Sequence, residues 1–368
     1  YDPDRIVMVF DHNVPARDVR TAQVLSGMRE FASEQGIRHV FDQGRGGIQH
    51  LVPAEKGVIR PGMIVVDGSH ACTDGALGVL ATGVSAEDRA VAMATGRLWF
   101  RVPETLRVTL MGRPRRHVSA MDIALSLLRR IGAGGATYLA IEYVGDTLGH
   151  LPMSGRFTLC NLAVEAGAKT GMVGVDEKTL AFYRTYDLPL PSRYPQSDAD
   201  AQAAHSLEID VEGLHLQVAA PYSPDNVCDL EDVEGISITN AFIGYCVNGR
   251  LDDLAQAAEV LDGRKVHPNV SLVVTPGSQR VYRDAVKEGY AETILDAGGV
   301  LTPPTCGACA GIHMGVLGPG DVAVSTTNRN FQGRMGHAES QVYLANPAVA
   351  AASAVTGKIT DPEEVLQR

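Results

Sequence analysis

The chain has 368 residues, 45% of them hydrophobic, which is enough for two or three domains with buried cores. Its formal net charge of −11 argues against a nucleic-acid surface and against membrane attachment through basic residues. Six cysteines are too few for a disulfide scaffold and indicate a reducing, cytoplasmic compartment. The first residues do not resemble a signal peptide, and no apolar run approaches the roughly 20 residues of a membrane-spanning helix, so neither nucleic acid nor membrane is an expected partner.

Strand-like apolar runs alternate with helical patterns along the chain, which is typical of an α/β fold. In residues 1–104, which we expect to form a first α/β domain, the run RIVMVF at 5–10 predicts a buried strand. A helix is predicted over 20–36, where Gly36 is a favourable residue for ending it. A second strand is predicted at 62–66, and the Ser-x-x-Asp of VSAEDRAVAMATG predicts the start of another helix.

A second α/β domain is predicted over 105–215, beginning with a strand at 105–112. Its last part, from about 185 to 215, is the most irregular segment of the chain. The Pro, Ser, Asp and Tyr residues there predict an exposed connection with a short helix and a domain boundary. The third α/β domain, 216–368, has strands predicted at 237–246, 269–277 and 322–331.

Three cysteines stand out by their position. Cys306 and Cys309 lie three positions apart in the glycine-rich run PPTCGACAG, and Cys246 ends a predicted strand sixty residues earlier (306 − 246). Loops that follow strands are where α/β proteins bind ligands. Three thiolates suit an iron–sulfur cluster with one iron free of protein ligands or an incomplete zinc site, while buried small residues and a redox dithiol are further alternatives. Spacing alone leaves these alternatives open.

The loop STTNRNFQGRMG follows the cysteine loop and carries two guanidinium groups, those of Arg329 and Arg334, beside Asn328. Planar guanidinium groups suit bidentate recognition of carboxylates. A redox dithiol needs no such anion pocket, whereas a metal centre that processes carboxylates does. The two loops together therefore favour a carboxylate-processing metal site.

The blocks GYCVNGRLDDL, PPTCGACAG and STTNRNFQGRMG, in this order, resemble the aconitase superfamily of iron–sulfur hydro-lyases, most closely the large subunits of 3-isopropylmalate dehydratase and homoaconitase. Further blocks extend the resemblance across most of the chain, among them FDHNVPA, GIQHLVPAEKG, SHACTDGALGVLATG and CNLAVEAGAKTGM. Each block is weak alone, but the ordered set is specific. The resemblance implies three α/β domains with mostly parallel sheets around a central iron–sulfur site.

The resemblance implies that Cys246, Cys306 and Cys309 bind one [4Fe–4S] cluster per subunit, whose open fourth iron acts as a Lewis acid on the substrate hydroxyl. The other cysteines are interpreted as structural: Cys72, Cys160 and Cys228. Catalytic roles are implied for Asp11, His12, His50, Ser69, His70 and Glu165. Substrate-binding roles are implied for Asn161, Asn328, Arg329 and Arg334.

Two of these assignments have a local physical reason. An adjacent Asp11 carboxylate favours and orients the imidazolium of His12, which in the family protonates the departing hydroxyl. Asn161 and Glu165 are four residues apart, which predicts that both lie on one face of a helix.

Four features depart from the family pattern and leave the substrate open. Gly68 precedes Ser-His where the family has Asp, with Asp67 one position away, and Ala71 replaces the following Thr. Tyr245 and Val247 flank the first cluster cysteine in place of Ser and Thr. Family large subunits also begin several dozen residues earlier, with a segment that adds a strand, a helix and an active-site side chain.

We therefore expect the large subunit of an enzyme that removes water from a malate-type hydroxy acid and returns it at the neighbouring carbon. The family's swivelling domain, which supplies a serine base and a further arginine, is not found in the sequence, so a small-subunit partner is expected. The expected substrate is a small di- or tricarboxylate. Two alternatives remain: a catalytically degenerate aconitase-like scaffold or sensor, and a structural zinc protein.

Overall fold

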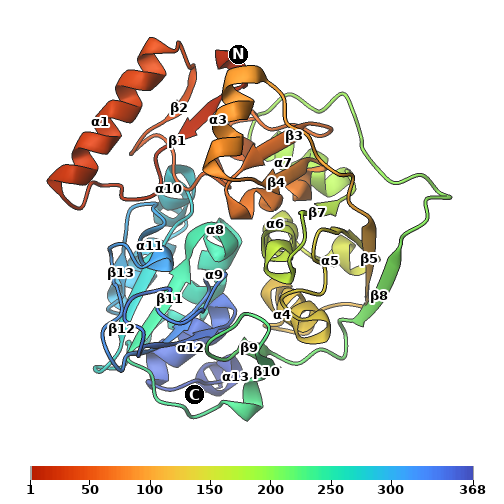
Figure 1. Ribbon diagram of the computed structural model, residues 1–368. Helices are drawn as coiled ribbons and strands as arrows, with labels where there is room; N and C mark the ends of the chain where they lie inside the picture. Colours follow the sequence, from red (N-terminus) through yellow and green to blue (C-terminus); the bar gives the residue numbers. More distant parts are fainter. Residues whose placement is uncertain (1, 368) are drawn as a thin grey trace.

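A computed structural model describes residues 2–367 of the chain, which form a mixed α/β fold with four mainly parallel sheets (Figure 1). The predicted fold class is confirmed at this level. No helix within these residues is long and apolar enough to cross a membrane.

Two small parallel sheets occupy the N-terminal part. Its elements are η1 (Pro3–Arg5), β1 (Val7–Val9), α1 (Val19–Glu34), β2 (His39–Phe41), α2 (Val52–Glu55), β3 (Ile64–Asp67), η2 (Ser69–Leu77), β4 (Leu80–Gly83) and α3 (Ala86–Thr95). β1 pairs with β2, and β3 with β4. The Asp18 carboxylate accepts the Thr21 N–H and so satisfies a free donor at the start of α1, which ends just before Gly36, as predicted. Ser85 caps α3 in the same way.

A four-stranded parallel sheet follows, in the order β7-β6-β5-β8. The elements are β5 (Thr105–Met111), α4 (Ala120–Ile131), β6 (Ala140–Val144), α5 (Thr147–His150), α6 (Met153–Leu162), η3 (Ala163–Ala166), β7 (Thr170–Val173), α7 (Glu177–Thr185) and β8 (His205–Asp210). The short helix predicted within 185–215 is wrong, because β8 forms there and pairs with β5 along its whole length. Only Leu207 and Ile209 of this edge strand turn away from solvent, so its sequence looks like a polar loop.

The C-terminal part contains a seven-stranded sheet in the order β10-β9-β15-β14-β11-β12-β13. The elements are β9 (Gln217–Ala219), β10 (Val227–Asp229), η4 (Leu230–Asp232), β11 (Asn240–Gly244), α8 (Tyr245–Asn248), α9 (Leu251–Leu261), β12 (Ser271–Thr275), α10 (Gln279–Lys287), α11 (Tyr290–Asp296), β13 (Val300–Leu301), η5 (Gly307–Ala310), β14 (Val322–Ser325), β15 (Gln341–Leu344), α12 (Pro347–Thr356) and α13 (Pro362–Leu366). β11 to β15 are parallel, while β9 pairs antiparallel with β10 and β15. The three strands predicted here are β11, β12 and β14.

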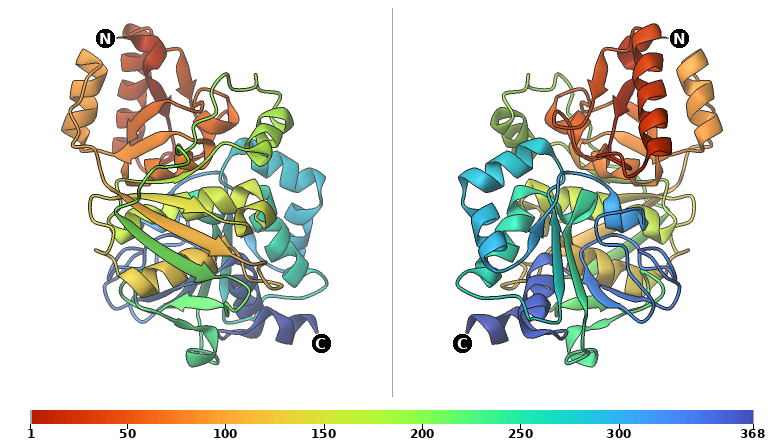
Figure 2. Two further views of the ribbon diagram at one scale, coloured as in Figure 1. Left: turned by 90° about the vertical axis from the view of Figure 1, so that its right-hand side faces the viewer. Right: turned by 90° about the vertical axis from the view of Figure 1, so that its left-hand side faces the viewer.

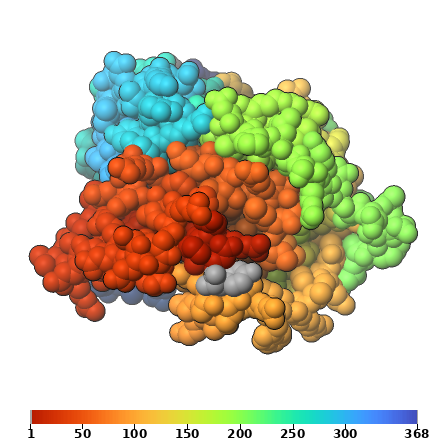
Figure 3. Space-filling model, turned by 90° about the horizontal axis from the view of Figure 1, so that it is seen from above, coloured from red at the N-terminus to blue at the C-terminus, as the bar shows by residue number. Residues whose placement is uncertain are grey.

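One hydrophobic core connects the three regions, since Ile48, Leu110 and Phe242 belong to the same buried cluster. The boundaries of the three domains stay a prediction. α6 and α8 lie side by side at the centre (Figure 1). Figure 2 shows the N-terminal elements, in red and orange, at the top of the molecule, and Figure 3 shows them from above, against the segments around α10 and α7. The Gln279 N–H donates to the Gly46 carbonyl at the first of these contacts, and the Tyr183 hydroxyl donates to the Ile59 carbonyl at the second.

Candidate active site

The three cysteines predicted as metal ligands come from two loops that follow strands of the seven-stranded sheet. Cys246 is the second residue of α8, directly after β11, while Cys306 and Cys309 lie at the start of η5 and within it. β11 ends at Gly244 with φ of +122°, and a Cβ there would overlap the Thr275 carbonyl oxygen. Only glycine therefore allows the turn that brings Cys246 over the end of the sheet.

The three thiols lie close enough to affect one another's ionisation. Burial raises the pKa of Cys246 to about 12, and the neighbouring Cys309 acts in the same direction. Burial also raises the pKa of Cys306 well above its ordinary value, with further contributions from Asp11, Cys246 and Cys309. Thiolates in this place would therefore need a bound cation to balance their charge, as a metal centre provides.

Two side-chain amides contact the Cys246 sulfur. The Nδ2 atoms of Asn161 and Asn328 each lie 3.3 Å from its Sγ, and the Asn328 amide also donates to Asn161 Oδ1 at 3.1 Å. N–H groups aimed at a sulfur stabilise it in its anionic, metal-bound form. The donor set around Cys246 therefore fits a thiolate-ligated centre.

Asp11 and His12 follow β1 and lie beside the cysteine loop. His12 Nδ1 donates to Asp11 Oδ1 at 2.6 Å, while Asp11 Oδ2 accepts the Gln49 N–H at 2.9 Å and lies 3.7 Å from the Cys306 Sγ. The hydrogen bond to Asp11 raises the pKa of His12, although partial burial opposes it. The His12 side chain remains 56% exposed, so its Nε2 can exchange a proton with a bound substrate.

One compact set of potential ligand atoms occurs within residues 2–367, those of Asp11, His12 and Cys306, all within 4.8 Å of one another. Both Asp11 oxygens already accept hydrogen bonds, which makes this set a poor site for a single ion. The three cysteine sulfurs do not form such a compact set, whereas a tetrahedral zinc ion with bonds of about 2.3 Å holds its sulfurs roughly 3.8 Å apart. Their wider spacing fits a multi-iron cluster better than one zinc ion.

Glu165 connects a histidine and an arginine. Its Oε1 lies 2.7 Å from His70 Nε2, and its two oxygens accept Arg329 Nε–H at 2.8 and 2.9 Å. Burial would raise the pKa of Glu165, but these two partners hold it below its ordinary value. Asn161 and Glu165 do not share one α-helix as predicted, because α6 ends at Leu162 and continues as the tighter η3. Both side chains nevertheless reach the site.

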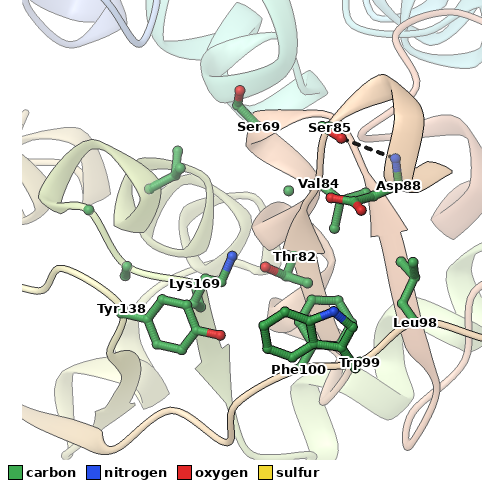
Figure 4. Close-up of a pocket in the computed structure, with 14 residues that line it drawn as sticks. Ser69, Thr82, Val84, Ser85, Asp88, Leu98, Trp99, Phe100, Tyr138 and Lys169 are labelled. Atoms are coloured by element: carbon green, nitrogen blue, oxygen red, sulfur yellow. Dashed lines mark hydrogen bonds between the residues drawn. The ribbon is translucent and has the colours of Figure 1, made fainter.

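His50 and Ser69 occupy different surroundings. His50 is buried, its ring centroid is 6.0 Å from that of His70, and burial lowers its pKa to about 3, so its imidazole is neutral at pH 7. Ser69 is exposed and lines a cavity of about 540 Å³, where its hydroxyl points away from Trp99 and Phe100 (Figure 4). No hydrogen bond joins the Ser69 side chain to another residue in the described part of the chain.

Arg334 differs from Arg329 in having no carboxylate within ion-pair distance among residues 2–367. Its Nε is buried and lacks a hydrogen-bond partner in the same range. Its charge and a hydrogen bond to Cys309 oppose the effect of burial on the pKa of that thiol, and its charge opposes the effect of Asp11 on the pKa of His12, so the guanidinium lies near both groups. A guanidinium that has no carboxylate partner in this position is suited to bind a substrate carboxylate.

Arg250 is a supporting residue whose role the sequence alone does not indicate. Its Nη1 donates to the carbonyls of Cys246 at 3.1 Å and Val247 at 3.3 Å, and its guanidinium lies 4.4 Å from the Phe157 ring centroid. Asp253 Oδ2 accepts the Arg250 N–H at 2.9 Å. Arg250 lies four residues after the candidate ligand Cys246 and three before Asp253, and this spacing was the one feature of the sequence that could have indicated its role.

Thr73 is a further residue of the site that the sequence did not indicate, because its partner Asn161 lies far away along the chain. The Thr73 hydroxyl accepts from Asn161 Nδ2 at 2.8 Å and donates to the His70 carbonyl at 2.6 Å.

Among the departures from the family pattern, Tyr245 is fully buried and has φ of +67°, an unusual backbone conformation for a bulky residue. Asp67 pairs with Arg89 of α3 at 3.3 Å.

The family model for the aconitase family (aconitate hydratase) matches residues 2–234 and 231–357. The 3-isopropylmalate dehydratase large subunit 1 of Methanopyrus kandleri is 51% identical over 367 residues, which cover 100% of this chain and 87% of that protein. In Methanothermobacter thermautotrophicus, a probable 3-isopropylmalate dehydratase large subunit is 49% identical over 98% of this chain and 86% of its own length. A probable methanogen homoaconitase large subunit of the same organism is 48% identical, over 99% of this chain and 85% of its own length. The chain therefore belongs to the aconitase family.

Proposed function

We propose that this chain is the large, catalytic subunit of a hydro-lyase that dehydrates and rehydrates a malate-type hydroxy acid, of the 3-isopropylmalate dehydratase or homoaconitase type. The observation that carries the proposal is one site that combines three thiols, the Asp11–His12 pair and the guanidinium of Arg334, whose buried Nε has no hydrogen-bond partner within residues 2–367. The names of the relatives support the same type of reaction.

Cys246, Cys306 and Cys309 would hold one [4Fe–4S] cluster, which when bound supplies a Lewis acid for the substrate hydroxyl. The amide N–H groups of Asn161 and Asn328 at the Cys246 sulfur support this assignment.

The side chains around the thiols have separate tasks in the proposed reaction. Arg334 binds a substrate carboxylate, while Glu165 holds Arg329 and His70 in place beside it. Asp11 fixes His12 through Nδ1, so that His12 Nε2 carries the proton for the departing hydroxyl, which leaves as water. On rehydration the same nitrogen takes a proton from the water that adds back. The hydrogen bond to Asp11 raises the pKa of His12, which favours the protonated imidazole that the first step needs.

A small subunit would complete the enzyme. The relatives are named large subunits, which implies such a partner for this chain as well. The base that removes the C–H proton next to the substrate carboxylate would come from that partner. Identities of 49% and 48% to the two Methanothermobacter proteins favour neither isopropylmalate nor homocitrate as the substrate.

Anaerobic reconstitution with iron and sulfide tests the metal centre. We expect about four irons and four sulfides per chain, with a [4Fe–4S]+ EPR signal after one-electron reduction by dithionite. Cys306→Ser should abolish the signal, whereas Cys228→Ser, on β10, should retain it. Zinc without sulfide in the anaerobically purified protein, or unchanged iron in Cys306→Ser, would contradict the assignment.

The reconstituted chain, mixed with the small subunit, is then assayed for formation of the alkene diacid from 3-isopropylmalate and from homocitrate. Turnover of either substrate supports the proposed enzyme. A fully loaded protein that, with the small subunit added, turns over no malate-type hydroxy acid would instead be a degenerate scaffold.

A further inference from the structure

A second cavity, of about 330 Å³, adjoins the turn that carries Cys246. It lies where the loop 113–119, the start of α6 and the junction of α8 with α9 meet. Its volume is in the range that holds small metabolites. None of the residues assigned above to the candidate active site lines it.

The inner wall of this cavity offers an unused hydrogen-bond acceptor. Asn248 is only 2% exposed, and its Nδ2 donates to Asp253 Oδ1 at 3.0 Å, which fixes the orientation of the amide. The Asn248 Oδ1 is buried and has no hydrogen-bond partner within residues 2–367. Asp253, 4% exposed, adds a carboxylate beside it. A ligand group that donates a hydrogen bond would satisfy Asn248 Oδ1, and a positive charge on that group would be attracted to the neighbouring Asp253 carboxylate.

The mouth of the cavity is positively charged, in contrast to the acceptor and carboxylate of its inner wall. Arg113, Arg115 and Arg116 are exposed there. Arg115 Nε donates to the Glu212 carbonyl at 2.8 Å, and Arg116 forms an ion pair with Glu259 at 3.0 Å. Arg113 has no ion-pair or hydrogen-bond partner in the described part of the chain, so its guanidinium is available for an anion.

We propose that this cavity binds a small zwitterion of the α-amino acid class. Its ammonium group donates to Asn248 Oδ1 beside the Asp253 carboxylate, and its carboxylate binds Arg113. Leu151 and Pro152 also line the cavity and provide an apolar wall for an aliphatic side chain. The bound amino acid contacts the same short helix, α8, that contains Cys246, two residues before Asn248. This inference is independent of the proposed hydro-lyase activity.

Binding is tested on the full-length chain by thermal-shift measurements with each of the twenty proteinogenic L-amino acids. The best binder is then compared by calorimetry with its 2-hydroxy acid, which lacks the ammonium, and with its decarboxylated amine, which lacks the carboxylate. We expect both analogues to bind at least about 10-fold more weakly, because each removes one of the two charges. Equal binding of either analogue, or no amino acid that binds at millimolar concentration, overturns the proposal.

Two variants locate the site. Arg113→Ala changes an exposed side chain and should weaken binding at least about 10-fold while the circular dichroism spectrum is retained. Asn248→Leu keeps the size of the side chain but removes the acceptor, and should abolish binding. Arg129 lies on α4 outside the cavity, where it is exposed and pairs with Asp229 of β10. The variant Arg129→Ala should therefore bind the amino acid like the parent protein. If Arg113→Ala binds like the parent, or Arg129→Ala loses binding equally, the site is not this cavity, whether or not Asn248→Leu folds.

Discussion

Buried charges at the level of single residues are compensated to very different degrees. Glu165 pairs with the Arg329 guanidinium and hydrogen-bonds His70, whereas Glu55, 8% exposed, has only the Ser278 hydroxyl at 3.0 Å. Burial raises the pKa of Glu55 from 4.5 to about 7, and the weak opposing contacts do not reverse this. The folded protein therefore keeps a proton that the unfolded chain releases between these two pH values. The contribution of Glu55 to stability consequently falls as the pH rises from 4.5 to about 7 and is level above that.

Glu55→Gln should remove this loss of stability. Its amide retains an acceptor for Ser278, so at pH 8 we expect a gain of up to about 3 kcal/mol in the free energy of unfolding, and little change near pH 4.5. Urea unfolding at both pH values measures the difference. Glu177→Gln, at a position 82% exposed on α7, should have little effect at either pH. An equal effect of Glu55→Gln at both pH values would show that ionisation is not the cause.

Arg334→Lys tests the proposed carboxylate contact, because it retains the charge and removes the planar fork. With the reconstituted enzyme and its small subunit, kcat/KM should fall about 10- to 100-fold, mainly through a higher KM. Steady-state kinetics measure the change, and Arg129→Lys on α4 is the matched control. A variant with unchanged KM would remove Arg334 from the list of substrate ligands.

The element that carries Cys246 cannot be stable by itself. α8 has only four residues, and a helix of one turn gains too little to offset its nucleation cost. Tertiary contacts hold it instead. The Thr158 hydroxyl donates to the Val247 carbonyl at 2.8 Å, and Arg250 donates to the carbonyls of Cys246 and Val247. The position of the first candidate ligand thus depends on α6 and on one buried guanidinium.

Arg250→Ala should release this turn. We expect a loss of about 2–4 kcal/mol in stability, since buried carbonyls lose a charged donor, and a lower iron content after reconstitution. Arg250→Lys should recover part of both. The control is Arg264→Ala, which changes a partly exposed arginine that also donates to backbone carbonyls, those of Val260, Asp262 and Val365. It should cost less than about 1 kcal/mol and leave the iron content unchanged.

On the scale of the whole molecule, the sequence predicted the strands that have a clear local pattern of apolar residues. β11 and β12 are buried on both faces and appear as continuous apolar runs, so both were predicted. β8 was missed because an edge strand with only two inward residues has no such run. The roles of Arg250 and Asn248 depend on which segments meet in space, and spacing along the chain does not reveal this.

The contact between η2 of the N-terminal region and β7 of the four-stranded sheet allows a test of how these two regions pack. η2, which begins with Ser69 and His70, packs on β7 so closely that a Cβ at Gly75 would overlap the Gly171 carbonyl oxygen. Gly75→Ala should therefore cost about 3 kcal/mol or more, because rigid backbone must move. Gly27→Ala, exposed on α1 with no atom within 4 Å of the new Cβ, should instead stabilise the protein by about 0.5–1 kcal/mol. Thermal and urea unfolding of the pair measure both effects. Equal stability of the two variants would mean that η2 and β7 are not in this contact in solution.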